Sequence, residues 1–211
     1  MTGVIVCGGK IEDYSYMKKY IRSADLIISA DSGARHCIRF HVVPDMLIGD
    51  FDSAGGEDLS ELASAGAEVV RFPSEKDMTD SELAVEEASR RGCTRIILLG
   101  ALGTRLDHSI SNIFLLKKLL DKDIEGMLAD EHNEARLINS GIELAREEGA
   151  FITLLPVNGA AKGVTTEGLY YPLKNATLET GSSWGVSNQF SEDTARVTVK
   201  EGYLLVIKAR D

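Results

Sequence analysis

Residues 26–53 of the chain read LIISADSGARHCIRFHVVPDMLIGDFDS. The runs Leu26–Ser29 and Met46–Ile48 are short and apolar, as buried strands are, and residues 32–40 between them are expected to form a helix. A strand, a helix and a second strand in this order predict a βαβ unit with two parallel strands. This stretch therefore indicates an α/β fold for the part of the chain that contains it.

The same alternation extends in both directions, from residue 1 to about residue 130. Further strands are expected at Val4–Cys7, Val69–Phe72, Ile96–Leu99 and Gly126–Ala129, and further helices near 13–22, 57–65, 80–91 and 108–121. Thr79 and Glu82 form a capping box at the start of the helix near 80–91. Ser109 or Asp107 is expected to cap the helix near 108–121. The alternation predicts a mainly parallel sheet with helices on both faces.

Beyond about Asn139 the pattern changes to short β-branched or alternating runs separated by Gly, Asn, Pro and Ser. These runs are FITLLPV, GVTTEGLYYPL, ATLET and ARVTVKEGYLLVIKA. They predict a small C-terminal antiparallel β-sandwich without helices. The boundary is expected between Arg136 and Gly149, which gives domains of residues 1–138 and 139–211.

The composition of the chain limits the classes of molecule that it is expected to bind. The chain has 211 residues, 44% hydrophobic and 27% charged, as globular proteins do. Lys and Arg number 23 and Asp and Glu 33, so the formal net charge is −10. Such a chain repels the backbone of nucleic acids, and we expect no nucleic-acid partner. It can still bind nucleotides where a divalent cation bridges carboxylates to phosphates.

The sequence also indicates the cellular compartment of the protein. Uncharged apolar runs such as Ile96–Thr104 are far shorter than the roughly 18 apolar residues of a membrane-spanning helix, so we expect no membrane partner. The start of the chain, MTGVIVCGGK, reads as a strand and not as a secretion signal. Cys7, Cys37 and Cys93 show neither a disulfide framework nor a zinc spacing. We therefore expect a cytoplasmic protein with its thiols in the core.

Ligands of open parallel sheets bind beyond the carboxyl ends of the strands, and the residues at those positions are unusually acidic here. The charged residues that follow the second to fifth expected strands are Asp31, Asp50, Asp52, Lys76, Asp77, Asp80, Arg105, Asp107 and His108. We expect these carboxylates and cations to meet at one edge of the sheet.

Asp50 and Asp52 are a candidate pair of metal ligands. In an extended segment their side chains leave on the same side while Phe51 turns toward the interior, and Gly49 allows close approach to the backbone. An Asx-type turn explains the tetrapeptide Asp50–Ser53 equally well when it is taken alone.

The other strand-end residues also have two interpretations. Asp77 and Asp80 suit a helix start, and with Lys76 that start also suits a phosphate. Arg105 can bind phosphate oxygens in a forked manner. Asp107 can be a cap and His108 a surface residue. The chain contains neither a Walker A motif nor GxGxxG.

One loop of the second half is also a candidate for ligand binding. Residues 181–188, GSSWGVSN, join two expected strands and contain the sole tryptophan, Trp184. If exposed near Tyr170 and Tyr171, Trp184 offers a face for a flat cationic ring. The alternative is a core tryptophan of the sandwich.

Taken together, the motifs resemble the thiamine pyrophosphokinase family over nearly the whole chain. The segments that carry the resemblance are ISADSGARH, PDMLIGDFDS, FPSEKDMTDSELAVEEA, LLGALGTRLDHSISNIFLL, GLYYPL and GVSNQF, with GDFDS, KDxTD, RxDH and GVSN in that order. The resemblance implies an α/β domain that binds ATP and Mg²⁺, a β-sandwich that binds thiamine, and a homodimer. It further implies transfer of the diphosphate of ATP to the thiamine hydroxyl with release of AMP.

The resemblance also implies roles for individual residues. It implies that the metal ligands are Asp50, Asp52 and Asp77, and that Asp80, Lys76 and Arg105 complete the catalytic set. The residues that it places at ATP are Asp31, Lys76, Arg105, Asp107 and His108. The residues that it places at thiamine are Tyr171, Ser187, Asn188 and Asp80. Two alternatives remain at this stage: a non-catalytic sensor of nucleotide or thiamine, and a pyrophosphokinase of another heterocyclic alcohol.

Overall fold

The structure is a computed structural model that describes residues 1–51, 56–75 and 77–211. Two expected site residues, Asp52 and Lys76, lie outside the described residues. The chain divides into two compact units, Met1–Glu131 and His132–Asp211. The division precedes β7 (Asn133–Ile138), which the sequence-based boundary at 138/139 assigns to the first domain. β7 pairs with β13 (Glu201–Ala209) and so lies in the second unit.

The first unit is the expected parallel sheet. Its strands are β1 (Thr2–Val6), β2 (Leu26–Ala30), β3 (Met46–Gly49), β4 (Glu68–Arg71), β5 (Arg95–Leu99) and β6 (Glu125–Ala129). They lie in the order β4-β3-β2-β1-β5-β6, and every pair is parallel. The strands begin within two residues of the positions expected from the apolar runs. Apart from the exposed edge strand β4, they are largely buried, and a strand buried on both faces needs an uninterrupted run of this kind.

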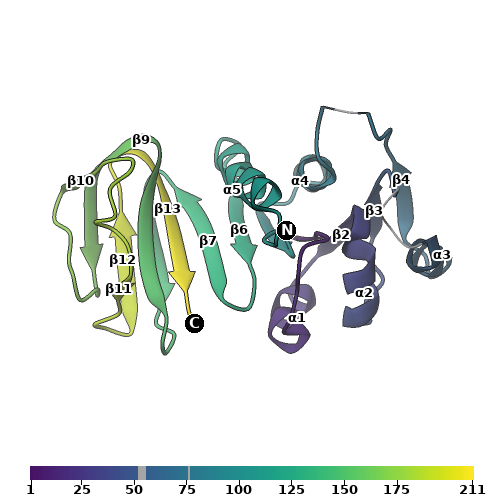
Figure 1. Cartoon of the computed structure of the whole chain (residues 1–211), viewed down its shortest axis with the longest axis horizontal. Coiled ribbons are helices and arrows are strands. Elements are labelled where there is room, and N and C mark those ends of the chain that lie inside the picture. The colour runs from purple at the N-terminus through teal and green to yellow at the C-terminus, as the bar shows by residue number, and fades with distance from the viewer. Residues whose placement is uncertain (52–55, 76) are drawn as a thin grey trace. The chain divides into compact units, whose positions relative to one another are not determined.

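Helices cover both faces of this sheet, as predicted. They are α1 (Tyr14–Arg22), α2 (Ala34–Phe40), α3 (Gly56–Ser64), α4 (Asp80–Arg90) and α5 (Leu106–Leu120). α4 and α5 pack together on one face, and α1, α2 and α3 lie on the other (Figure 1). Apolar side chains of alternate strand residues, such as Val4, Val6 and Ile97, form a core with Met17 and Phe40 from the helices.

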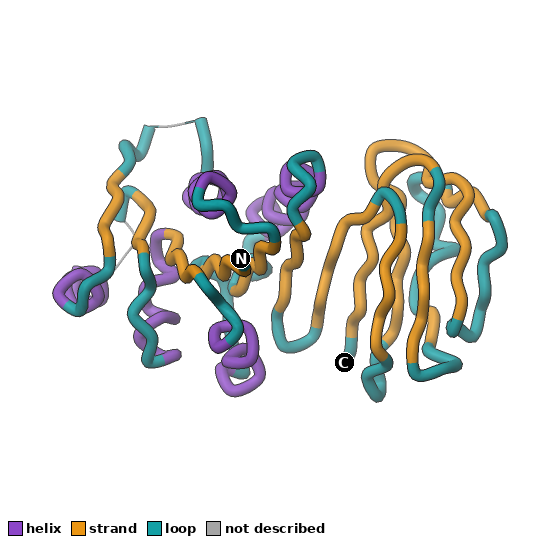
Figure 2. Tube along the Cα trace, turned by 180° about the vertical axis from the view of Figure 1, so that it is seen from behind, coloured by secondary structure: helices purple, strands orange, loops and turns teal. Residues whose placement is uncertain are grey.

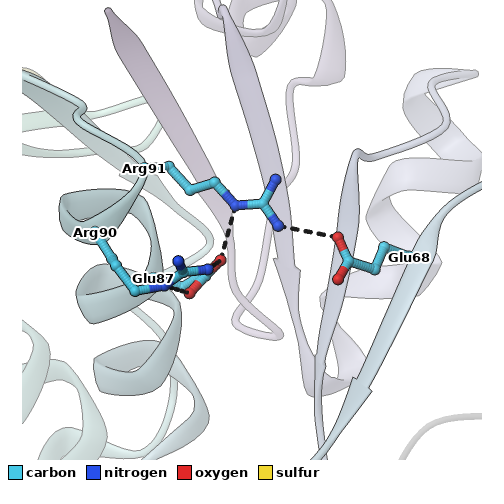
Figure 3. Close-up of polar contacts among 4 residues, drawn as sticks. All are labelled: Glu68, Glu87, Arg90 and Arg91. Carbon is cyan, nitrogen blue, oxygen red and sulfur yellow. Dashed lines mark hydrogen bonds and ion pairs between the residues drawn. The ribbon is translucent and has the colours of Figure 1, made fainter.

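An ion-pair cluster joins α4 to the edge strand β4. Arg91 Nη2 lies 2.9 Å from Glu68 Oε2, and Arg91 Nε lies 2.8 Å from Glu87 Oε1 (Figure 3). Arg90 also bonds Glu87, and this hydrogen bond lowers the pKa of the Glu87 carboxyl. Each such exposed pair contributes at most about 1 kcal/mol. Of these contacts, the Arg91–Glu68 pair links the carboxyl end of α4 to β4.

The second unit consists of strands and loops (Figure 2). All its strand pairs are antiparallel. Its remaining strands are β8 (Gly141–Ala145), β9 (Phe151–Glu167), β10 (Ala176–Leu178), β11 (Asn188–Gln189) and β12 (Thr194–Thr198). β9 pairs with β13 and β11 through its first half and with β10 and β12 toward its end. Apolar residues from both sets of strands, among them Leu154, Val197 and Leu204, form one core. This is the expected sandwich.

Two details of this unit differ from the sequence prediction. FITLLPV and the start of GVTTEGLYYPL are parts of a single strand, β9, which continues through the left-handed conformations of Asn158, Gly159 and Gly163. These residues bend the strand without ending its pairing. The segment 168–173, by contrast, is mostly loop, with one isolated bridge between Leu169 and Phe190.

Two further sequence expectations concern the thiols and the membrane. Cys7, Cys37 and Cys93 are free and buried, so the prediction of core thiols is confirmed. No helix in the described ranges is long and apolar enough to cross a membrane.

Candidate active site

A cavity of about 810 Å³ lies in the first unit, at the carboxyl ends of its strands. Residues that follow β1, Cys7–Lys10, and residues that follow β5, 100–105, line two of its sides. The strand order reverses between β1 and β5, since β2 lies on one side of β1 and β5 on the other. This topological switch point is where open α/β sheets bind ligands.

The backbone is closely packed where the loops at the cavity meet. Gly9 N donates to Gly100 O at 2.7 Å, which joins the loops that follow β1 and β5. A Cβ at Gly9 would lie 2.4 Å from that oxygen, and a Cβ at Gly33 would lie 2.0 Å from Val6 O. Only glycine allows such close approach, so these positions bring the backbone of three segments to one place.

Asp31 and Asp50 line the cavity from the ends of β2 and β3. Asp31 starts a short 3₁₀ turn in the left-handed conformation, with φ of 44°. Gly49 packs so closely on Asp31 that an added Cβ would lie 3.1 Å from the Asp31 Cα. The two strand ends are therefore adjacent, as the sequence predicts.

The expectation that residues 50–52 are extended is wrong at Phe51, whose φ is 60°. The Phe51 ring does turn into the core, where it is 8% exposed and lies beneath the Arg71 guanidinium at 5.2 Å. Burial of the ring thus fixes the local path of the chain through a left-handed residue. Since Asp52 lies outside the described residues, its orientation relative to Asp50 stays a prediction.

The start of α4 lines a further side of the cavity through Thr79, Asp80 and Ser81. Thr79 caps the helix, because its Oγ1 accepts a hydrogen bond from Glu82 N at 3.2 Å. The carboxylate of Glu82 is bound by Lys118 on α5 at 2.8 Å. Of the two hydrogen bonds of the capping box, the one from Glu82 N to Thr79 is therefore the one that forms. Asp77 is exposed and is not among the described residues that line the cavity.

The start of α5 contributes Arg105 and His108. Arg105, and not Ser109 or Asp107, occupies the N-cap position, so the predicted cap is wrong. The reason is that Arg105 holds Asp107 in the first turn, with contacts of 3.2 and 2.6 Å. This hydrogen bond lowers the pKa of the exposed Asp107 to about 2. Ser109 instead bonds the main chain of the preceding loop, where its Oγ accepts from Gly103 N at 3.0 Å.

The structure therefore brings together five of the expected site residues. Those that line the cavity are Asp31, Asp50, Asp80, Arg105 and His108. Asp107 lies beside them as the partner of Arg105 and is not itself among the lining residues within the described part of the chain.

Sequence reasoning missed the cations that α2 and the first loop supply. Lys10, Arg35 and Arg39 line the cavity, together with the buried His36. Arg35 and Arg39 are four apart, a spacing that places them on one side of a helix and that the sequence does show. This side of α2 faces the cavity because of the order of the strands in the sheet, and no local sequence pattern predicts that order. The cavity thus combines carboxylates, which suit a divalent cation, with cations that suit phosphate.

The candidate residues of the second unit also lie together. Asn188 is buried, its Oδ1 accepts from Tyr171 N at 3.0 Å, and its Nδ2 donates to Tyr171 O at 2.7 Å. Ser187, with φ of 59°, donates its main-chain N–H to Thr153 Oγ1. Asn188 thereby fixes the backbone of Tyr171, whose side chain is 64% exposed.

Aromatic side chains are exposed around this loop. Trp184 is 61% exposed, so its interpretation as a core residue of the sandwich is wrong. Tyr170 and Tyr171 pack edge to face, with ring centroids 4.9 Å apart.

Comparisons with known protein families match both units. The family model "Thiamin pyrophosphokinase, catalytic domain" matches residues 17–128. The model "Thiamin pyrophosphokinase, vitamin B1 binding domain" matches residues 140–204.

Individual relatives agree with the family models. The chain is 27% identical to the thiamine pyrophosphokinase of Bacillus subtilis (strain 168) over 209 residues, 98% of each chain. It is 29% identical to thiamine pyrophosphokinase 1 of Oryza sativa subsp. japonica over 188 residues, which cover 82% of this chain and 69% of that protein.

Solved structures resemble the whole fold. The crystal structure of the Bacillus subtilis thiamine pyrophosphokinase gives a TM-score of 0.90 at 26% identity and covers 100% of both chains. That of the Geobacillus thermodenitrificans thiamin pyrophosphokinase gives 0.85 at 29% identity, over 100% of this chain and 98% of the other.

Proposed function

The chain belongs to the thiamine pyrophosphokinase family, and we propose that it transfers the diphosphate of ATP to the hydroxyl of thiamine, releasing thiamine diphosphate and AMP. The observation that carries the proposal is that both the catalytic and the vitamin-binding family models match, at residues 17–128 and 140–204. A sensor that binds only thiamine has no need for several carboxylates at the carboxyl edge of an α/β sheet.

A magnesium ion fits the donors that line the cavity. Asp31, Asp50 and Asp80 offer carboxylate oxygens, the ligands that Mg²⁺ prefers. In our proposal Asp50 holds the metal together with Asp52 and with Asp77, which is exposed. When bound, Mg²⁺ neutralises charge on the phosphate oxygens of ATP.

The protein's own groups then position the substrates and offset charge. Arg35, Arg39 and Arg105 offer guanidinium groups to phosphate oxygens from two sides of the cavity, and we place the triphosphate among them. Lys76, Asp107 and His108 complete the proposed ATP site. Such transfers need little covalent chemistry from the enzyme, since positioning and charge neutralisation supply most of the acceleration.

The chemical step balances without a further reactant. The thiamine hydroxyl oxygen forms a bond to the β-phosphorus of ATP, and the bond from that phosphorus to the α,β-bridging oxygen breaks. AMP leaves with the bridging oxygen and the bonding electrons. We assign acceptance of the hydroxyl proton to Asp80, because it lines the cavity and is only partly exposed.

We place thiamine against Tyr171 and Ser187 of the second unit. The exposed ring of Tyr171 offers an aromatic face to the cationic thiazolium ring of thiamine. Asn188 contributes by holding the Tyr171 main chain from both sides. The match of the vitamin B1 binding model to this unit supports the placement.

A homodimer is part of the proposal. Leu106, Ile110 and Phe114 recur every four residues on α5 and are 70%, 42% and 57% exposed, an apolar stripe that a second copy of the chain would cover. Sedimentation equilibrium of the wild type and of Phe114→Glu tests this, with a dimer expected for the first and a shift toward monomer for the second. A monomeric wild type would contradict it. The three free, buried thiols support our further proposal of a cytoplasmic location.

Product analysis tests the proposed reaction. The purified chain is incubated with ATP, Mg²⁺ and thiamine, and nucleotides and thiamine esters are separated by chromatography. We expect AMP and thiamine diphosphate in equal amounts. ADP with thiamine monophosphate would move the attack to the γ-phosphorus. Binding of ATP or thiamine without either product would favour a sensor, or a pyrophosphokinase of another heterocyclic alcohol.

A further inference from the structure

His36 is a buried histidine at the edge of the cavity that the proposed chemistry does not use. It is 3% exposed and lies on α2. Its Nε2 lies 2.7 Å from Gly9 O, and its Nδ1 lies 2.5 Å from the hydroxyl oxygen of Tyr14 on α1. The ring thus joins α1 and α2 to the loop that follows β1.

The partners of His36 determine its hydrogen-bonding state. A carbonyl oxygen only accepts, so Nε2 carries the hydrogen and donates to Gly9 O. In the neutral ring Nδ1 then accepts, and the Tyr14 hydroxyl donates to it. Burial lowers the pKa of His36, and the charges of Arg35 and Arg39 lower it further, while the bond to Gly9 opposes them. The neutral ring is the form that these contacts select.

The same network reaches an arginine of the cavity. Arg39 Nη1 donates to the Tyr14 hydroxyl oxygen at 3.2 Å, and the Arg39 guanidinium lies 5.8 Å from the Tyr14 ring centroid. Hydrogen bonds therefore run from Arg39 to Tyr14, from Tyr14 to His36, and from His36 to Gly9. The Tyr14 hydroxyl thus donates to His36 and accepts from Arg39, so His36 fixes the orientation of the hydroxyl that Arg39 contacts.

The loop that receives these bonds lies at the switch point. Arg35 donates to Gly8 O, so two consecutive carbonyl oxygens are bound by side chains of α2. Carbonyl oxygens repel phosphate, and a donor on each reduces that repulsion. Gly9 N is meanwhile held by Gly100 O.

We propose that His36 is a positioning residue for ATP, which holds the Gly8–Gly9 turn and, through Tyr14, directs Arg39 toward the triphosphate. The proposal rests on the proposed function in that it names ATP as the anion. It predicts a selective effect on the nucleotide, because thiamine carries no phosphate.

Three variants and one control test the role. His36→Ala removes both bonds, His36→Gln keeps an amide donor for Gly9 O, and Tyr14→Phe keeps the ring while cutting the link to Arg39. His41→Asn is the control, since His41 is an exposed histidine at the end of the same helix in a left-handed conformation that asparagine tolerates. For each protein we would measure kcat, both KM values, the ATP dissociation constant by calorimetry without thiamine, and the melting temperature.

We expect His36→Ala to raise the KM and the dissociation constant for ATP about tenfold, as the loss of the hydrogen bonds of one buried side chain does. The KM for thiamine should stay within about twofold. His36→Gln and Tyr14→Phe should raise the ATP constants less, about threefold, and His41→Asn should leave them unchanged.

Several results would overturn the proposal. A folded His36→Ala with wild-type ATP constants would do so, as would equal changes of the thiamine and ATP constants, which indicate a merely structural role. If His36→Ala does not fold, His36→Gln and Tyr14→Phe decide, and unchanged ATP binding in both overturns it. A wild type that binds ATP without forming thiamine diphosphate would remove the proposed function, while the ATP dissociation constants would still test His36.

Discussion

At the scale of single residues, the cavity of the first unit combines groups of both charges. Asp31, Asp50 and Asp80 reach it from β2, β3 and α4, and Arg35 and Arg39 reach it from α2. Carboxylates bind divalent metal ions, and guanidinium groups bind phosphate. A cavity with both groups therefore suits a nucleotide whose phosphates carry a metal ion. Substitution of a single one of these residues is therefore expected to change turnover without a comparable change in stability.

Asp50→Asn should reduce kcat about 100-fold or more, since a metal ligand is worth several kcal/mol of charge stabilisation in the transition state. The amide has a similar size, so the melting temperature should stay close to that of the wild type. Steady-state rates at several Mg²⁺ concentrations and a thermal melt measure both effects. Asp121→Asn, which changes a surface partner of Lys117, is the control and should be active. Near-normal turnover of Asp50→Asn at low Mg²⁺ would refute the metal assignment.

Gly33→Ala should destabilise the first unit by roughly 3 kcal/mol, because the new Cβ would lie 2.0 Å from Val6 O and the backbone must move. Urea unfolding measures the loss. In the control, Gly103→Ala, the nearest atom lies 3.6 Å from the new Cβ, an ordinary contact. Equal stability of the two variants would contradict the close packing at Gly33.

The sequence allows some of these residues to be predicted and not others. Asp31 and Asp50 follow apolar strands, and parallel strands end at the same edge of a sheet, so their meeting was predictable. Lys10, Arg35 and His36 were not, because they reach the cavity only through the placement of β1 between β2 and β5. The left-handed conformation of Phe51 accompanies burial of its ring, a tertiary contact that no local pattern gives.

At the scale of elements, α4 links the cavity to the far edge of the sheet. Its first turn lines the cavity, and the arginine that follows its last turn binds Glu68 on β4 (Figure 3). Its start was predictable from Thr79, whereas the start of α5 was not, because the side chain of Asp107 is held by Arg105. In the second unit, bends at Asn158 and Gly159 resemble strand ends in the sequence, yet β9 continues through them.

Thr79→Ala should cost about 1 kcal/mol of unfolding free energy, because the hydrogen bond from Glu82 N to the hydroxyl is lost. Chemical denaturation measures this value. Thr79→Ser keeps a hydroxyl acceptor and should retain most of the stability. If the Thr79→Ala and Thr79→Ser variants are equally stable, the hydroxyl cap contributes nothing to the free energy of unfolding.

At the scale of the whole molecule, each of the two units has a core of its own. The second unit also carries a network of largely buried charges. Lys208 Nζ lies 2.8 Å from Glu147 and 3.4 Å from Glu134, and Arg210 binds Glu147 as well. Burial alone would lower the pKa of Lys208, but the bond to Glu147 and the charges of both glutamates raise it. The bond to Lys208 lowers the pKa of Glu147, against the effect of burial.

This network predicts an acid-sensitive contribution to stability. A carboxyl whose pKa is lowered by folding stabilises the protein above its ordinary value of 4.5, and that contribution is lost as the pH falls through the lowered pKa. Glu147→Gln should therefore be less stable than the wild type by about 1 kcal/mol at pH 7. The difference should shrink below pH 4.5.

Urea unfolding at pH 7 and at several values below 4.5 measures the difference. Glu201→Gln is the control, since Glu201 forms an exposed pair with Lys162, 3.3 Å apart, and should show almost no change. A constant difference between Glu147→Gln and the wild type at every pH would contradict the electrostatic explanation.

The most direct test of the central claim follows the phosphorus atoms of ATP. In parallel single-turnover reactions with thiamine and Mg²⁺, ATP carries a radioactive label at the α- or the γ-phosphorus. We predict that the γ-label appears in thiamine diphosphate and the α-label in AMP. The γ-label in thiamine monophosphate, or in inorganic phosphate beside ADP, would contradict transfer of the diphosphate.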